Sequence, residues 1–125
     1  MTPTDLATAL RAHAQGLYCL EAAAELLIAQ SWLQRADFSG KFINISPVDG
    51  QAPAIVNWAA AITALDAGEL PCSGGEQRML RMTASIGGGI PVDLQDSLTG
   101  IDEHNVQLLL QAVLHASGRR PNQVS

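Results

Sequence analysis

The chain has 125 residues, of which 47% are hydrophobic and only 15% charged, and its formal net charge is −5. The hydrophobic share excludes a disordered chain, and the length fits one domain rather than a multidomain enzyme. Seven basic residues against twelve acidic ones disfavour a nucleic-acid binder that relies on phosphate contacts.

The first segment begins with a well-specified helix start. Thr2 can cap the helix, Pro3 suits its first position, and Asp5 follows Thr2 at the spacing of a capping box. Beyond it, alternating steps of four and three residues predict a heptad seam. The members of this seam are Leu6, Leu10, His13, Leu17, Leu20, Ala24 and Leu27.

The length of that first helix is an open point. A continuous helix from Pro3 to Gln30 would measure roughly 42 Å, whereas a compact domain of this size has a diameter of about 36 Å. Gly16 costs about 1 kcal/mol in a helix interior and is a place where the helix can break. We favour one long helix, which would overhang the domain and require cover.

The middle of the chain is less regular. Asp37 can start a short helix that runs through Phe38 and Phe42, while residues 42–45 can instead form a short extended segment. Residues 46–50 are typical of a turn. A second clear helix is expected to start at Pro53, to bury Trp58 and Ile62, and to end at Gly68.

The last third of the chain predicts three helices. Ser73 and Glu76 form a capping box for the first, which Gly87–Gly89 stops. A short helix is expected over residues 91–98, with Leu94 and Leu98 inside. The last helix starts at Asp102 and ends at Gly118. Its predicted buried face, at helical spacing, is Val106, Leu109, Leu110, Val113 and Leu114.

Together these elements predict an all-α fold, a compact bundle of four or five helices with a long N-terminal helix and short connecting helices. Residues 1–118 form a single helical domain, and residues 119–125 are expected to be a flexible tail. The most apolar window, residues 17–29, is too short for a membrane span and contains two glutamates. No signal peptide pattern or cysteine metal motif is present, so we expect a cytoplasmic protein with reduced Cys19 and Cys72.

Two groups of polar residues are candidates for chemistry. Glu21 and Glu25 share one helix face, as acid–base or metal-binding carboxylates do. A solvated face, or ion pairs with Arg78 and Arg81, is the interpretation that we favour. His104 and His115 share one face of the last helix with two glutamines, which indicates a polar stripe facing solvent. No cofactor motif occurs around either glycine cluster, so no cofactor or metal is expected.

The C-terminal half resembles short, largely uncharacterised helical proteins of actinobacterial type. The segments that carry the resemblance are Met79–Met82, Ile90–Leu94, Leu98–Asp102 and Val113–Gly118, so that it covers about residues 75–118. The resemblance implies no function.

The sequence favours a non-enzymatic interaction protein that self-associates, as a homodimer, or binds a protein partner, with no role for nucleic acid or membrane. Charged residues are scarce along the first helix, so the interface is expected there, at Leu6, Leu10, His13, Leu17, Leu20 and Leu27. One alternative is a binder of small apolar ligands, with Trp58, Trp32 and Met79 around an interhelical pocket. Another is a small enzyme that uses carboxylates and a histidine. The candidate site residues of these alternatives are Glu21, Glu25, Trp58 and His104.

Overall fold

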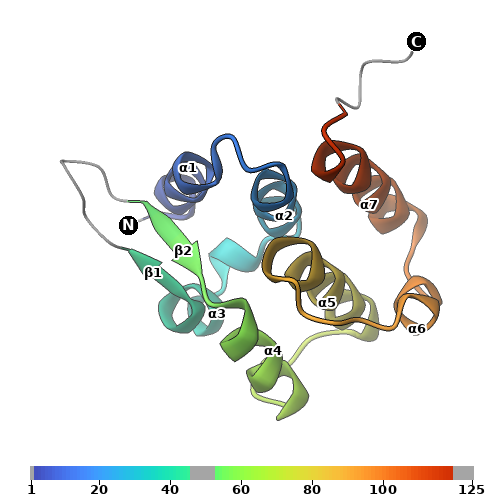
Figure 1. Ribbon diagram of the computed structural model, residues 1–125. Helices are drawn as coiled ribbons and strands as arrows, with labels where there is room; N and C mark the ends of the chain where they lie inside the picture. The colour runs from blue at the N-terminus through green and yellow to red at the C-terminus, as the bar shows by residue number, and fades with distance from the viewer. Residues whose placement is uncertain (1, 46–52, 120–125) are drawn as a thin grey trace.

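The computed structural model describes residues 2–45 and 53–119, and this part of the chain is dominated by helices (Figure 1). The elements in chain order are α1 (Pro3–Ala14), α2 (Tyr18–Ala29), the 3-10 helix η1 (Trp32–Gln34), α3 (Ala36–Phe42), β1 (Ile43–Ile45), β2 (Ala54–Val56), α4 (Trp58–Asp66), α5 (Gly74–Gly88), α6 (Leu94–Leu98) and α7 (Glu103–Ala116). The coarse prediction of a mostly helical fold is confirmed. None of the helices in the described residues is long and apolar enough to cross a membrane.

The prediction of a single long N-terminal helix is wrong, because α1 and α2 are separate helices. The predicted capping box is present, since Thr2 Oγ1 accepts from the Asp5 backbone N–H at 3.1 Å and the Asp5 carboxylate accepts from the Thr2 N–H at 3.0 Å. However, Gly16 adopts a left-handed φ of +85°, which ends α1 and turns the chain back into α2. The Glu21 carboxylate accepts a hydrogen bond from the Gly16 N–H at 2.9 Å and so stabilises this turn.

The turn at Gly16 changes the role of the heptad seam. Leu6, Leu10 and Leu27 are 7%, 5% and 0% exposed, within the main core of the domain, so these three predicted interface residues pack inside their own chain. His13 and Leu20 are partly buried. Leu17, at the turn, is 53% exposed. Folding the two halves together buries the seam without a partner, which removes the reason for expecting an interface there.

The middle of the chain combines both predicted alternatives. Residues 36–42 form α3, and residues 43–45 continue as β1, which pairs antiparallel with β2 in the register Ile43–Val56. The predicted helix start at Pro53 is wrong, because residues 54–56 pair as a strand and the helix begins only after Asn57. The Asn57 side chain caps α4 by accepting from the Ala60 N–H at 3.1 Å. The turn predicted over residues 46–50 lies outside the described residues.

Helix α5 confirms the capping box of Ser73 and Glu76, with both hydrogen bonds at 3.1 Å. Its glycine run does more than stop the helix. A Cβ atom on Gly87 would lie 2.6 Å from the Cβ of Ala23, and one on Gly88 would lie 2.7 Å from the Cβ of Trp58. Gly89, with a φ of +68°, then ends the helix. The first two glycines therefore allow α5 to approach α2 and α4 closely.

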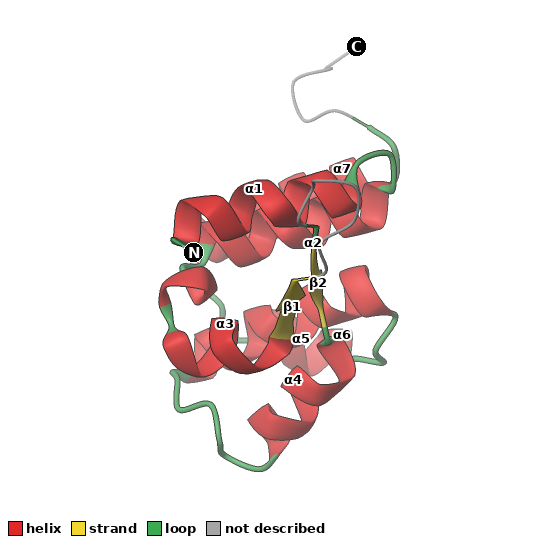
Figure 2. Cartoon of the chain, turned by 90° about the vertical axis from the view of Figure 1, so that its left-hand side faces the viewer, coloured by secondary structure: helices red, strands yellow, loops and turns green. Residues whose placement is uncertain are grey.

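Helix α2 lies between α1 and α7, and Figure 2 shows these helices along the upper side of the molecule. The large core lies between α1, α2, η1, α3, α4 and α5. A smaller cluster lies beneath α7, and its buried members are Ala22, Leu26, Met79, Met82 and Ala112. Helix α7 therefore packs on a separate and smaller apolar surface.

Helix α7 begins at the predicted cap, where Asp102 accepts from the Asn105 N–H at 2.8 Å. Of its predicted buried face, only Leu109 packs against the smaller cluster, and the prediction is wrong for the other four residues. Leu110 and Val113 are both 53% exposed, while Ala112 is only 4% exposed. The same error affects α6, where Leu94 and Leu98 are 58% and 50% exposed instead of inside. The chain thus packs α7 through Ala112, Ala116, Leu108 and Leu109 and leaves its other large apolar side chains largely outside.

Candidate functional site

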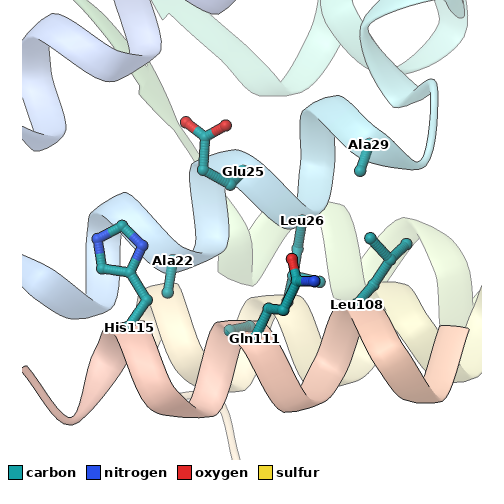
Figure 3. Close-up of a pocket in the computed structure, with 8 residues that line it drawn as sticks. Ala22, Glu25, Leu26, Ala29, Leu108, Gln111 and His115 are labelled. Carbon is teal, nitrogen blue, oxygen red and sulfur yellow. The ribbon is translucent and has the colours of Figure 1, made fainter. Parts of the chain in front are cut away.

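A groove between α2 and α7 is the first candidate site, with a volume of about 320 Å³ (Figure 3). Its floor is small and apolar, whereas Glu25, Gln111 and His115 supply polar groups. The lining residues are Ala22, Glu25, Leu26, Ala29, Leu108, Gln111, Ala112 and His115. The volume is at the lower end of the roughly 300–1,000 Å³ typical of ligand pockets.

Glu21 ties three parts of the chain together at the end of this groove. Its Oε1 atom lies 2.8 Å from His115 Nε2 on α7, and its Oε2 atom accepts from the Gly16 N–H at 2.9 Å. The hydrogen bond with His115, followed by that from Gly16, lowers the pKa of Glu21 below its ordinary value. One carboxylate oxygen of Glu21 therefore stabilises the α1–α2 turn, and the other attaches α7 to α2.

Glu25 is held by Arg11 of α1 in a two-pronged ion pair, with Arg11 Nε to Glu25 Oε2 at 2.8 Å and Nη2 to Oε1 at 2.9 Å. The same contact raises the pKa of Arg11. The predicted partners Arg78 and Arg81 are wrong for this pair of glutamates, since Arg81 lies 2.7 Å from Asp66 instead. An ion pair is therefore present, but its cation comes from the neighbouring helix α1.

These contacts leave neither glutamate as a free acid–base group. Each carboxylate uses both of its oxygens in hydrogen bonds to other parts of the chain. Among the described residues, no cluster of three or more histidine, cysteine or acidic side chains is arranged to hold a metal ion. The arrangement ties α1, α2 and α7 together through one ion pair and the hydrogen bonds of Glu21.

The predicted histidine stripe divides between two environments. His104 is exposed, but His115 is partly buried against α2 through Glu21. The solvent-facing interpretation is therefore wrong for His115. Sequence reasoning missed this pair because its members are 94 residues apart.

The aromatic candidates belong mainly to the core. Trp58 is 8% exposed and packs against the glycines of α5, while Trp32 and Met79 are 1% and 0% exposed. Trp58 also contributes to a cavity of about 90 Å³ between α1, α2 and β2, with His13 in its lining. That volume is well below the size of a typical ligand pocket.

The second candidate site is the outward side of α7, here called the α7 face. It consists of Val106, Leu110, Val113 and Leu114, which are 36%, 53%, 53% and 38% exposed. In Figure 1 α7 forms the outer edge of the helical layer, with α2 on its inner side. No Asp, Glu, Lys or Arg occurs in residues 104–118, so the α7 face has no formal charge within it.

The packing of α7 explains this exposure. Its inner side places Ala112 and Ala116 toward the cluster that contains Ala22 and Leu26. Small side chains allow two helices to approach closely, whereas leucines would hold them apart. Four large exposed apolar side chains on one side of one helix make this surface a candidate interaction site.

The chain matches no protein-family model, no curated protein and no solved structure. The resemblance to helical proteins of actinobacterial type therefore stays a prediction. The protein is thus a small helical domain with two candidate sites. The carboxylates at the polar groove are bonded to other groups of the same chain, and the α7 face is exposed and apolar.

Proposed function

We propose that this protein is a non-enzymatic interaction domain that binds another protein surface through the α7 face. The observation that carries the proposal is the exposure of four large apolar side chains on one side of one helix. A helix whose apolar side is not covered by its own domain fits the groove or helix face of a partner.

The energy available from this face is modest and limits the strength of binding. Burying a whole leucine or valine side chain contributes about 1.5–3 kcal/mol, so four side chains that are about half exposed contribute roughly 3–5 kcal/mol. Association costs an estimated 4–15 kcal/mol in lost freedom. An apolar surface of similar size on the partner doubles this contribution to roughly 6–10 kcal/mol, which lies within the range of that cost, so the face supports weak, reversible binding.

The alternatives have less support. An enzyme that uses Glu21 and Glu25 requires at least one available carboxylate, but Glu25 is held in an ion pair with Arg11 and Glu21 is held by hydrogen bonds with His115 and the Gly16 N–H. A small ligand fits the groove between α2 and α7 by volume, but its floor is formed largely by alanines.

We also propose that the protein works in a reducing cytoplasm, and the free thiols of Cys19 and Cys72 support this compartment.

The proposed function is tested by changing the face without changing the core. We expect Leu110→Asp to abolish complexes of the full chain, measured by native mass spectrometry of the purified protein and by affinity capture from its own cell extract. His104→Asp is the matched control, because it adds a negative charge to an exposed polar position that helical spacing turns about 120° away from Leu110. A wild-type chain that stays monomeric at micromolar concentration and captures no partner would contradict the proposal.

A further inference from the structure

We propose that the partner of the α7 face is a second copy of this chain, packed antiparallel across a two-fold axis beside Leu110. This inference rests on the proposed function and names the occupant of the same surface. A symmetric dimer of this type uses one patch on both copies, so the patch must be complementary to itself. Spacing, charge and size each bear on that condition.

The spacing of the α7 face is symmetric about Leu110. Val106 lies four residues before it and Leu114 four residues after it, so the three lie close to one line along the helix. When two α7 helices run antiparallel with Leu110 at the centre, Val106 of each copy packs against Leu114 of the other. The smaller valine opposite the larger leucine gives matched contacts at both ends.

The charges at the two ends of the helix complement this arrangement. Glu103 begins α7 and Arg119 follows its end, both exposed, with no other acidic or basic side chain except histidine between them. An antiparallel pair places Glu103 of one copy near Arg119 of the other, twice in each dimer. It also places the positive N-terminal end of each helix dipole beside a negative C-terminal end. A parallel pair would instead bring like ends together.

The absence of charge within the face favours a second copy over a foreign protein. Two chains that each carry a net charge of −5 repel one another, so self-association is favoured where acidic side chains are absent from the contact or are paired with a cation across it. Residues 104–118 meet that requirement. A foreign partner selected by charge would instead require charged residues in the α7 face, and the face contains none.

The size of the face sets the expected strength. Helix α7 has 14 residues and is therefore about 21 Å long. One helix of this length presents less than the roughly 800 Å² per partner that a stable interface buries. We therefore expect a dimer that dissociates in the micromolar range.

Cysteine cross-linking tests the arrangement, with Cys19→Ser and Cys72→Ser as the background because both native thiols are free. Under mild oxidation, Leu110→Cys is expected to form a covalent dimer on its own, since each Leu110 lies beside the axis. Val106→Cys and Leu114→Cys are each expected to stay monomeric alone and to cross-link when the two variants are mixed. His104→Cys is the matched control on the same helix, because helical spacing turns this exposed side chain about 120° away from Leu110.

The charges supply a second measurement on the uncross-linked protein. Glu103→Arg is expected to raise the dimer dissociation constant by about three- to tenfold, for two exposed ion pairs. Combining it with Arg119→Glu is expected to restore the wild-type value. Circular dichroism confirms that each variant is folded before its dissociation constant is measured.

Each outcome bears on one of the two proposals. Cross-linking of Val106→Cys alone shows a parallel pair and overturns the inference, as does a dimer in which Leu110→Cys does not cross-link. A monomer that captures a foreign protein through the α7 face overturns the second copy but leaves the proposed function intact. A face whose substitution changes neither kind of complex overturns the proposed function itself.

Discussion

Replacing Leu110 with alanine tests the orientation of α7, on which both proposals depend. Helical periodicity alone places Leu110 in the core, where truncation of a leucine to alanine costs about 2–5 kcal/mol. In the structure its side chain is 53% exposed. Only about half of its 1.5–3 kcal/mol of transfer energy is available to lose, and alanine returns a few tenths through its higher helix propensity. We therefore expect the free energy of unfolding of the monomer to fall by less than about 1 kcal/mol.

The matched variant is Ala112→Leu, two positions further along the same helix. Ala112 is 4% exposed and belongs to the cluster that contains Leu26, Met79 and Met82. Three extra carbon atoms at such a site force its neighbours apart, which typically costs 1–3 kcal/mol. The smaller side chain is therefore the one whose enlargement destabilises the domain, the reverse of what the apolar periodicity predicts.

Both variants are compared with the wild type by urea unfolding followed by circular dichroism. A protein concentration of about 1 µM or lower keeps self-association from adding to the measured stability. A loss of more than about 2 kcal/mol in Leu110→Ala, together with an unchanged Ala112→Leu, would refute the orientation of α7. The α7 face would then lie inside the domain.

Two further predictions concern the core and the polar groove. Gly87→Ala is expected to lower the free energy of unfolding by at least about 1 kcal/mol, because its Cβ would lie 2.6 Å from that of Ala23. Gly75→Ala, with open space around it, is expected to be neutral or stabilising, and equal effects of the two would contradict the close packing. For the groove, the lowered pKa of Glu21 means that the unfolded chain binds this proton more readily than the folded one. Stability from Glu21 is therefore present near neutral pH and is lost as the pH falls below about 5. Melting temperatures from pH 7 to pH 3 are expected to decline less steeply in Glu21→Gln than in the wild type, and parallel declines would contradict the role of this carboxylate.

The parts of the fold that were predicted correctly depend on short-range chemistry. The capping boxes at Thr2 and Ser73 and the cap at Asp102 need only residues within three positions, so the local sequence specifies them. The turn at Gly16 was harder, because the heptad pattern is the same on both sides of it and permits a straight helix or a hairpin. The choice between them depends on burying the seam within the domain, which is a property of the whole chain.

The candidate site was predicted in its residues but not in its partners. Glu21 and Glu25 were recognised as a pair, yet their partners His115 and Arg11 lie 94 and 14 positions away. Local spacing contains no information on such contacts. The orientation of α7 failed for a related reason, since one helix can carry an apolar stripe of large residues and a stripe of alanines. Packing against Ala22 and Leu26 selects the alanines, and the sequence of α7 alone does not show which surface it meets.

The scarcity of charge in this chain has a different consequence from the one that composition suggests. The structure pairs Arg11 of α1 with Glu25 of α2 and Arg81 of α5 with Asp66 of α4, so these two arginines hold separate helices together, while Arg35 pairs with Asp37 at the start of α3. None of these arginine–carboxylate pairs lies on α7, where residues 104–118 have no acidic or basic side chain other than histidine. The uncharged surface is therefore not on the first helix, where the composition places it, but at the opposite edge of the layer formed by α1, α2 and α7. Because α7 is attached through Ala112, Ala116, Leu108, Leu109 and one histidine–glutamate contact, its other large side chains stay outside, and an apolar contact between two copies is the arrangement that we propose to cover them.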